Sequence, residues 1–435
     1  MAGSGMRPFS RNLILIYTAA WLRSFGIGLL GVVLGVFLSR EGFSSTSIGI
    51  VIAAGLAGAA AATAVVTLKA DRLGRRRMLF VLSCLTAVGA LPLLFHSGMA
   101  LLAPVAFLGM LNGMGTDRSA SFALEQAVIP GLVSDQQRTW GLAWYNVVLD
   151  ASGALGALAA GLPIVGHRLW GVDLTTAYTM LFRGFVVVNL LSGAFYLLLS
   201  PQVEVANSQA PPTGQPPVSP ETRSKVFRLS ALFAIDSLGG GLLTDALVSY
   251  WFFRRFNIAE DRLAVLFFTV HILNALSHLG AAALARRIGL VKTMVFTHLP
   301  SSIFLVAASV APSARWAVLL FLLRESLVEM DVPTRQSYVA AVVRPSERTF
   351  ASGVTNLTRN LAWAASSSVA GVFMQRIALA APLLLGGGLK IFYDLLLWRA
   401  FRHVKAPEEQ STQHSAVSIQ PETTSPADQG IKDRG

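Results

Sequence analysis

The chain has 435 residues, of which 53% are hydrophobic and only 13% are charged. A soluble domain is about a quarter charged, so this composition excludes an ordinary soluble protein and indicates an integral membrane protein. The formal net charge of +12 is typical of basic cytoplasmic loops in such a protein and does not require a nucleic-acid partner. The single cysteine, Cys84, excludes an intramolecular disulfide.

Twelve apolar segments of about the length that a transmembrane helix needs follow one another along the chain. They cover residues 12–38, 46–67, 78–95, 99–123, 140–164 and 176–199 in the first half, and residues 226–252, 263–285, 291–310, 316–340, 349–373 and 382–398 in the second. The first segment is too long for a cleaved signal peptide and is expected to span the membrane. The sequence therefore predicts an all-α membrane protein with twelve transmembrane helices.

Two polar stretches divide and end this array. Residues 201–224 hold six prolines with Gln, Ser and Thr, which predicts a cytoplasmic linker between two six-helix bundles, residues 1–200 and 225–405. Residues 406–435 are polar and are predicted to be a disordered cytoplasmic tail. If the N-terminus is inside and the segments alternate, most Lys and Arg residues of the loops lie in the cytoplasm, so both termini are expected there.

The loop between the second and third segments, residues 67–77, reads TLKADRLGRRR. Its cations hold the loop in the cytoplasm, and its glycine permits a tight reversal, so a loop that only fixes topology is one interpretation. The order of residues also resembles the loop between helices 2 and 3 of the major facilitator superfamily. The matching residues are Asp71, Arg72, Gly74, Arg75 and Arg76, whereas Thr67 and Lys69 depart from the pattern.

The two halves share a sequence frame. Gln126, Arg138, Thr139, Asn146 and Gly161 recur 210 residues later as Gln336, Arg348, Thr349, Asn356 and Gly371. Five matches at one offset indicate an internal duplication. Parallel six-helix repeats are the architecture of the major facilitator fold, so the resemblance now extends over nearly the whole chain.

Polar and ionisable residues inside the predicted spans are the candidates for function, because a charge in a bilayer is costly and normally faces the protein interior. The cavity and the coupling site are expected to use Arg23, Asp117, Arg118, Asn146, Asp150, Asp236, Asp245, Glu325, Glu329, Asn356 and Arg359. Arg23 stands alone in its segment and needs a carboxylate or an anionic substrate. Its expected partners are Asp236, Asp245 or Glu329.

The tenth segment carries the most charge. Glu325 and Glu329 are four residues apart and are predicted to share a helix face, and two such carboxylates do not easily ionise together in a buried site. This favours Glu329 as a group that binds and releases a proton. A ladder of ion pairs that only fixes helix packing is the alternative, and it is favoured for Asp331 and Arg335. Pro333 is expected to interrupt the helix.

The resemblance implies a cytoplasmic gate closed by ion pairs. Glu125 is placed to pair with Arg75 or with Arg138, and Asp71 is expected at the N-terminal end of a helix, where a carboxylate is favoured. The predicted gate consists of Asp71, Arg72, Gly74, Arg75, Arg76, Glu125, Arg138 and Arg348.

Three polar residues follow one face of the eighth segment, namely His271, Asn274 and His278. Two histidines at this spacing suggest a metal site, but hydrogen-bonding residues of a membrane cavity are the favoured interpretation. No metal and no cofactor are expected.

These patterns predict a secondary transporter, monomeric and in the bacterial inner membrane, that exports small organic molecules in exchange for protons. Residues 153–156 (GALG) resemble the antiporter signature Gly-Pro-x-x-Gly without its proline. An importer, or an exporter of an anionic metabolite or a metal(loid) species, is the alternative. A membrane enzyme is disfavoured because the chain has no HExxH or P-loop pattern, and a sensor or scaffold that transports nothing is a third class.

Overall fold

The computed structural model describes residues 10–95, 97–117, 119–133, 138–204, 218–343 and 348–401. The regular elements of these residues are helical, as predicted. The first half contains α1 (Arg11–Arg40), α2 (Ser45–Leu73), α3 (Arg75–Gly89), α4 (Leu91–Leu94), α5 (Met99–Leu108), α6 (Ala120–Leu132), α7 (Arg138–Ala159), α8 (Leu162–Trp170), α9 (Leu174–Leu197) and the 3-10 turn η2 (Pro201–Val203). The second half contains α10 (Pro220–Gly241), α11 (Asp245–Phe256), α12 (Glu260–Ile288), α13 (Leu290–Ser309), α14 (Ala314–Val328), α15 (Asp331–Val342), α16 (Arg348–Arg376) and α17 (Ala381–Phe401).

Nine helical stretches of the described residues are long and apolar enough to cross a membrane, so the count of twelve stays a prediction. The predicted segments 99–123, 316–340 and 349–373 are not among the nine. The first two are interrupted, because the helix stops at Leu108 and resumes at Ala120, and stops at Val328 and resumes at Asp331. The predicted segment 226–252 is also broken, between α10 and α11.

These breaks have a structural consequence. Irregular backbone at membrane depth is tolerated only where it is buried in protein or lines a polar cavity, and transporters place such breaks at their binding sites. In the tenth segment the break lies at Glu329 and Met330, ahead of Pro333, which falls in the first turn of α15, where a missing N–H costs little. The breaks in α5–α6, α10–α11 and α14–α15 therefore indicate where a site is built.

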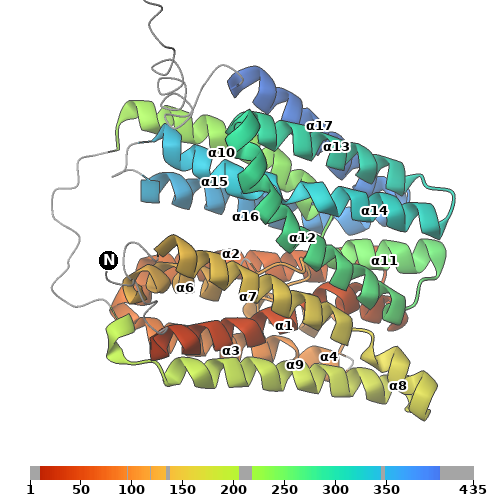
Figure 1. Cartoon of the computed structure of the whole chain (residues 1–435). Helices are drawn as coiled ribbons and strands as arrows, with labels where there is room; N and C mark the ends of the chain where they lie inside the picture. Colours follow the sequence, from red (N-terminus) through yellow and green to blue (C-terminus); the bar gives the residue numbers. More distant parts are fainter. Residues whose placement is uncertain are drawn as a thin grey trace, which may run out of the picture.

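The helices form two groups side by side, α1–α9 in one and α10–α17 in the other (Figure 1). The groups meet where α2 packs on α16, α7 on α12 and α1 on α11. At one end, which we call the basic-turn face, α2 turns into α3 at Gly74 and α12 turns into α13 at Gly289. At the other end, the far face, α1 turns into α2 and α11 turns into α12.

Small residues let the helices approach closely. A Cβ on Gly55 of α2 would overlap the backbone carbonyl of Leu111, so these two segments touch backbone to backbone. The helix α10 begins inside the predicted linker, because Ser219 caps it by accepting a hydrogen bond from the Thr222 N–H, and Pro220 fits the first helical position. Residues 205–217 and the predicted tail lie outside the described residues.

Candidate functional site

A buried ion cluster surrounds Arg23 of α1. Its guanidinium contacts a carboxylate oxygen of Asp117 at 2.8 Å and one of Glu125 at 2.5 Å. The hydroxyls of Tyr145 and Tyr196 each donate a hydrogen bond of 2.6 Å to Glu125. All five side chains are buried, and each charge has an opposite charge beside it, which is the condition under which buried charges are tolerated.

This cluster overturns two predictions. Arg23 does not pair with Asp236, Asp245 or Glu329 of the second half, because carboxylates of its own half satisfy it. Glu125 forms its ion pair with Arg23 and not with Arg75, because it lies in the second turn of α6, away from the end of that helix, Leu132, that points toward the basic-turn face. The side chain of Arg138 lies outside the described residues.

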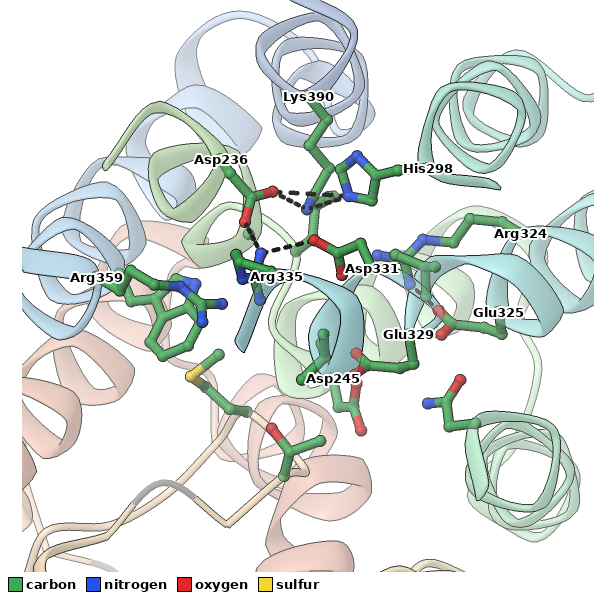
Figure 2. A pocket seen from close by; sticks show the side chains of 18 of the residues that line it. Asp236, Asp245, His298, Arg324, Glu325, Glu329, Asp331, Arg335, Arg359 and Lys390 are labelled. Carbon is green, nitrogen blue, oxygen red and sulfur yellow. Dashed lines mark hydrogen bonds and ion pairs between the residues drawn. The ribbon is translucent and has the colours of Figure 1, made fainter. Parts of the chain in front are cut away.

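A second buried network lies in the other half, around Asp236 of α10 (Figure 2). Its carboxylate contacts Lys390 Nζ at 2.8 Å, Arg335 Nη1 at 3.2 Å and His298 Nε2 at 3.6 Å. All four side chains are at least nine-tenths buried. This network joins α10, α13, α15 and α17 into one electrostatic unit.

Two more carboxylates complete this network. Arg335 also contacts Asp331 at 2.6 Å, which confirms the predicted ion pair, and His298 Nδ1 lies 3.0 Å from Asp394. The sequence analysis did not select His298, Lys390 or Asp394. The signal was present, since each is an ionisable residue inside an apolar segment.

The two networks are related by the repeat with their charges exchanged. Glu125 and Arg335 stand 210 residues apart, in the same frame as the repeated Gln126 and Gln336. In the first half the fourth segment supplies the carboxylate and the first supplies Arg23, whereas in the second half the tenth segment supplies the arginine and the seventh supplies Asp236. An ion pair between corresponding helices therefore occurs in both halves with opposite polarity.

Two adjoining cavities lie between these networks. The smaller, about 100 Å³, is lined mainly by the second half, including Asp236, Asp245, Glu325, Arg335 and Arg359. The larger, about 290 Å³, is lined by both halves: Asp117, Gln126, Asn146 and Asp150 on one side, and His271, Asn274, His278 and Glu329 on the other. Thr116, His271, Asn274, Glu329 and Val332 line both cavities, so the two adjoin each other.

Matches to known proteins identify the family. The model of the Major Facilitator Superfamily matches residues 16–367. The chain belongs to the major facilitator superfamily. The predicted fold is thereby confirmed, and this facilitator is a membrane transporter by family.

Three relatives illustrate how this facilitator compares with known proteins. The uncharacterized membrane protein YJR124C of Saccharomyces cerevisiae is 25% identical over 436 residues, covering 93% of this chain and 97% of the yeast protein. The human organic anion transporter MFSD10 superposes with a TM-score of 0.57 at 19% identity, over 90% of this chain and 100% of that chain. The inward-open xylose transporter XylE from E. coli gives a TM-score of 0.68 at 13% identity, over 92% of this chain and 98% of that one. The two structures show a shared fold.

The remaining cavity predictions have mixed outcomes in this facilitator. Asn146 is exposed and lines the larger cavity, where Asp150 lies 3.9 Å from His278 Nε2. Arg359 lines the smaller cavity and donates a hydrogen bond of 3.1 Å to Ser237. Asn356 is exposed on α16 and lines neither of the two cavities. Arg118 lies outside the described residues.

The predicted carboxylate pair of the tenth segment is divided by the helix break. Glu325 is buried near the end of α14 and forms an ion pair with Arg324. Glu329 is the residue that follows the last residue of α14, and it lines both cavities, so the two carboxylates do not share a regular helix face (Figure 2). Glu325 lines the smaller cavity alone and is paired with Arg324, whereas Glu329 lines both cavities, so only Glu329 meets the cavity that the two halves share.

The loop that contains the predicted gate residues turns at Gly74. The backbone of this glycine has φ +93°, a conformation that residues other than glycine adopt only with strain. Directly after it, the N–H groups of Arg75 and Arg76 donate to the carboxylate of Glu204, at 2.6 and 3.2 Å. Glu204 thus occupies the helix N-terminal position that the sequence analysis assigned to Asp71, which instead lies in the last turn of α2.

For the other predicted gate residues, the structure describes only the backbone position. Arg138 is the first residue of α7 and Arg348 the first residue of α16, both at the basic-turn face. The side chains of Asp71, Arg72, Arg138 and Arg348 lie outside the described residues, so their predicted ion pairs stay predictions.

Proposed function

We propose that this facilitator is a monomeric secondary transporter of the cell membrane that exports small organic molecules in exchange for protons. The observation that carries the proposal is the 290 Å³ polar cavity, because residues of both halves line it together with the helix-break carboxylate Glu329. A site shared by two halves becomes accessible to alternate sides of a membrane when the halves rock about it. The bilayer, the substrate and the proton are the partners that this activity requires.

The arrangement of the halves supports an inward-facing state. At the far face, Glu260 of α12 accepts hydrogen bonds of 2.5 and 2.9 Å from Arg40 of α1, and Tyr178 of α9 also donates to it. Beside it, Arg168 contacts Asp261 at 2.5 Å. These contacts join the two halves. Toward the basic-turn face, by contrast, Asn146 on the cavity wall is exposed. The basic-turn face is taken as cytoplasmic because it carries the excess of Lys and Arg.

Glu329 is the proposed coupling residue. Proton exchange needs a group that is protonated in one state and ionised in another, and a carboxylate on a cavity wall meets this need. The charge of Glu329 acts on four titratable side chains near it: Asp245, His271, Arg324 and Arg335. Arg23, which the sequence analysis placed across the cavity, has no such role in this proposal because Asp117 and Glu125 neutralise it.

The pairing of the buried cations also argues against the alternative of an anionic substrate. That alternative requires intramembrane arginines that have no carboxylate partner on the protein and can therefore bind an anionic substrate. Arg23, Arg324 and Arg335 each contact a carboxylate of the protein itself.

The test uses everted membrane vesicles from cells that produce the chain, with empty-vector vesicles beside them. A panel of radiolabelled organic cations, anions and neutral molecules is offered under an imposed pH gradient, inside acidic. We expect accumulation of at least one compound, and its loss when a protonophore is added. Glu329→Gln should abolish uphill accumulation but keep exchange of labelled for unlabelled compound, because exchange needs no net proton movement.

The matched control is Glu325→Gln, four residues away and already paired with Arg324, which should reduce uphill transport less. Accumulation that survives the protonophore would remove the proton from the proposal. Undiminished uphill transport by Glu329→Gln would remove this residue as the coupling group.

A further inference from the structure

Two buried polar atoms in the cavity make no hydrogen bond within the described part of the chain. His271 and Asn274, one helical turn apart on α12, are 4% and 8% exposed, and both line both cavities. Within the described part of the chain, His271 Nε2 and Asn274 Oδ1 make no hydrogen bond. Buried polar atoms are nearly always hydrogen-bonded, and leaving one unsatisfied is costly. These two atoms are therefore suited to a partner that arrives in the cavity.

A carboxylate lies near His271 and lines the smaller cavity together with Asn274. Asp245 is the first residue of α11, directly after the break that ends α10, and one of its oxygens lies 3.8 Å from His271 Nε2. That distance is too long for a hydrogen bond, but a single donor group between the two atoms can reach both. Figure 2 places Asp245 and Glu329 on the side of the smaller cavity away from the Asp236–Lys390–His298 group. Asp245 is thus apart from the cations of that network.

The charges of the side chains that line the larger cavity favour a positively charged ligand. The larger cavity is lined by Asp150, Glu329 and the Arg23-paired Asp117, and its described lining residues include no Lys or Arg. In the smaller cavity, Arg335 and Lys390 are held by Asp236 and Arg324 by Glu325, while Arg359 donates a hydrogen bond to Ser237. The carboxylates and amide oxygens that line the larger cavity repel an anionic ligand and attract a cationic one.

We propose that Asp245, His271 and Asn274 bind a protonated amine, so that the substrates are small organic cations bearing N–H donors. An ammonium group supplies both the positive charge and several donors, which matches a carboxylate, a ring nitrogen and an amide oxygen. A quaternary ammonium has no N–H to offer and an anion has the wrong charge. The inference rests on the proposed transport function, and it adds the substrate class to it.

The test compares three probes with the same aromatic body: phenethylamine, its N-acetyl derivative and phenylacetate. Binding of radiolabelled phenethylamine to the full-length protein purified in detergent is measured by scintillation proximity. We expect saturable binding that unlabelled phenethylamine displaces and the other two probes do not. Asp245→Asn and Asn274→Leu should each weaken binding by about tenfold or more, the effect of removing an acceptor from a charged donor.

Two further variants keep the test decisive. Asn274→Asp keeps an acceptor at this position and should retain binding even if Asn274→Leu folds poorly. Thr269→Val is the matched control on the same helix, because the Thr269 hydroxyl bonds to the Val265 carbonyl of its own helix, and it should bind like the wild type. Equal binding of the N-acetyl probe, absence of phenethylamine binding, or wild-type binding by a well-folded Asn274→Leu would each overturn the inference.

Binding in detergent separates this inference from the proposed function. Phenethylamine that binds as expected but is never accumulated in everted vesicles supports the amine site and contradicts export. Proton-driven accumulation of phenylacetate without phenethylamine supports the transport function and overturns the amine site.

Discussion

At the scale of single residues, the interior is held together by charges that neutralise one another. Arg23 lies between Asp117 and Glu125, and Asp236 lies between Lys390 and Arg335. Each of these two networks lies within one half. The halves can then move relative to each other without separating the charges of these networks, because each network moves as part of one half.

Arg23→Met tests this neutralisation. The substitution leaves Glu125, which is completely buried, and Asp117 without their cation, so we expect a loss of about 3–5 kcal/mol of stability. The measurement is the apparent melting temperature of the detergent-purified protein. The control is Arg376→Met on α16, where the arginine is exposed and little change is expected.

A double variant separates charge from packing. Arg23→Met with Glu125→Gln removes one of the two stranded charges and should recover part of the loss. Equal melting temperatures for Arg23→Met and the wild type would show that the cluster contributes no net stability.

The residue scale also shows what the sequence can predict. Position within an apolar segment was enough to identify Arg23, Asp117 and Asp236 as buried charges, whereas Glu125, just beyond its predicted segment, was assigned to the cytoplasmic gate. It was not enough to identify their partners, because partner choice depends on how far each helix is rotated and how deep each residue lies. The carboxylates nearest in the fold came from the same half, a fact of packing that no spacing in the sequence records.

At the scale of elements, the informative features are helix ends and breaks. The predicted segment 99–123 looks continuous in hydrophobicity, yet it is interrupted between α5 and α6. Gly109, Gly113 and Gly115 lie in the interruption, and Gly115 has φ +81°. Three glycines in seven residues are the signal for a break, since glycine weakens a helix and alone adopts positive φ freely. The sequence analysis treated residues 99–123 as one continuous segment and missed this local effect.

Glu204→Ala tests the capped turn at Gly74. Glu204 accepts hydrogen bonds from the first two N–H groups of α3. Its loss should therefore lower the free energy of opening this helix end by about 1–2 kcal/mol. The measurement is hydrogen–deuterium exchange of the peptide that begins at Arg75, which should exchange faster. The equivalent turn at Gly289, with φ +91°, belongs to the other half, so it is the internal control and should not change. Unchanged exchange at Arg75 and Arg76 would contradict a capping role for Glu204.

At the scale of the whole molecule, the duplicated halves are joined mainly by close helix packing and by polar contacts at the far face. Besides the contacts of Glu260, Ser45 and Tyr250 share a hydrogen bond of 2.8 Å, and Thr46 donates one of 2.5 Å to Gln375. The 210-residue frame predicted the duplication, but it did not predict where the halves join. Arg40 and Glu260 have no place in that frame, since their contact belongs to one conformation of the halves and not to the fold of either.

Glu260→Gln tests whether this contact holds the far face closed. Glu260 is completely buried and takes three hydrogen bonds from the first half, two from Arg40 and one from Tyr178. Removing the charge of Glu260 destabilises the state that is closed at the far face. It does not destabilise the open state, because Arg40 is partly exposed and is hydrated when the halves separate. Each 1.4 kcal/mol lost shifts the equilibrium about tenfold toward the state open at the far face.

The shift is measured as a distance between spin labels on Glu41→Cys and Arg262→Cys, two exposed positions of opposite halves, in a Cys84→Ser background. Glu260→Gln should add a population at longer distance. Asp261→Asn is the matched control, because its partner Arg168 is largely exposed and such a pair contributes little. A distance distribution identical to that of the control would mean that apolar packing of α1 against α11 and α12, and not the buried carboxylate, closes this face.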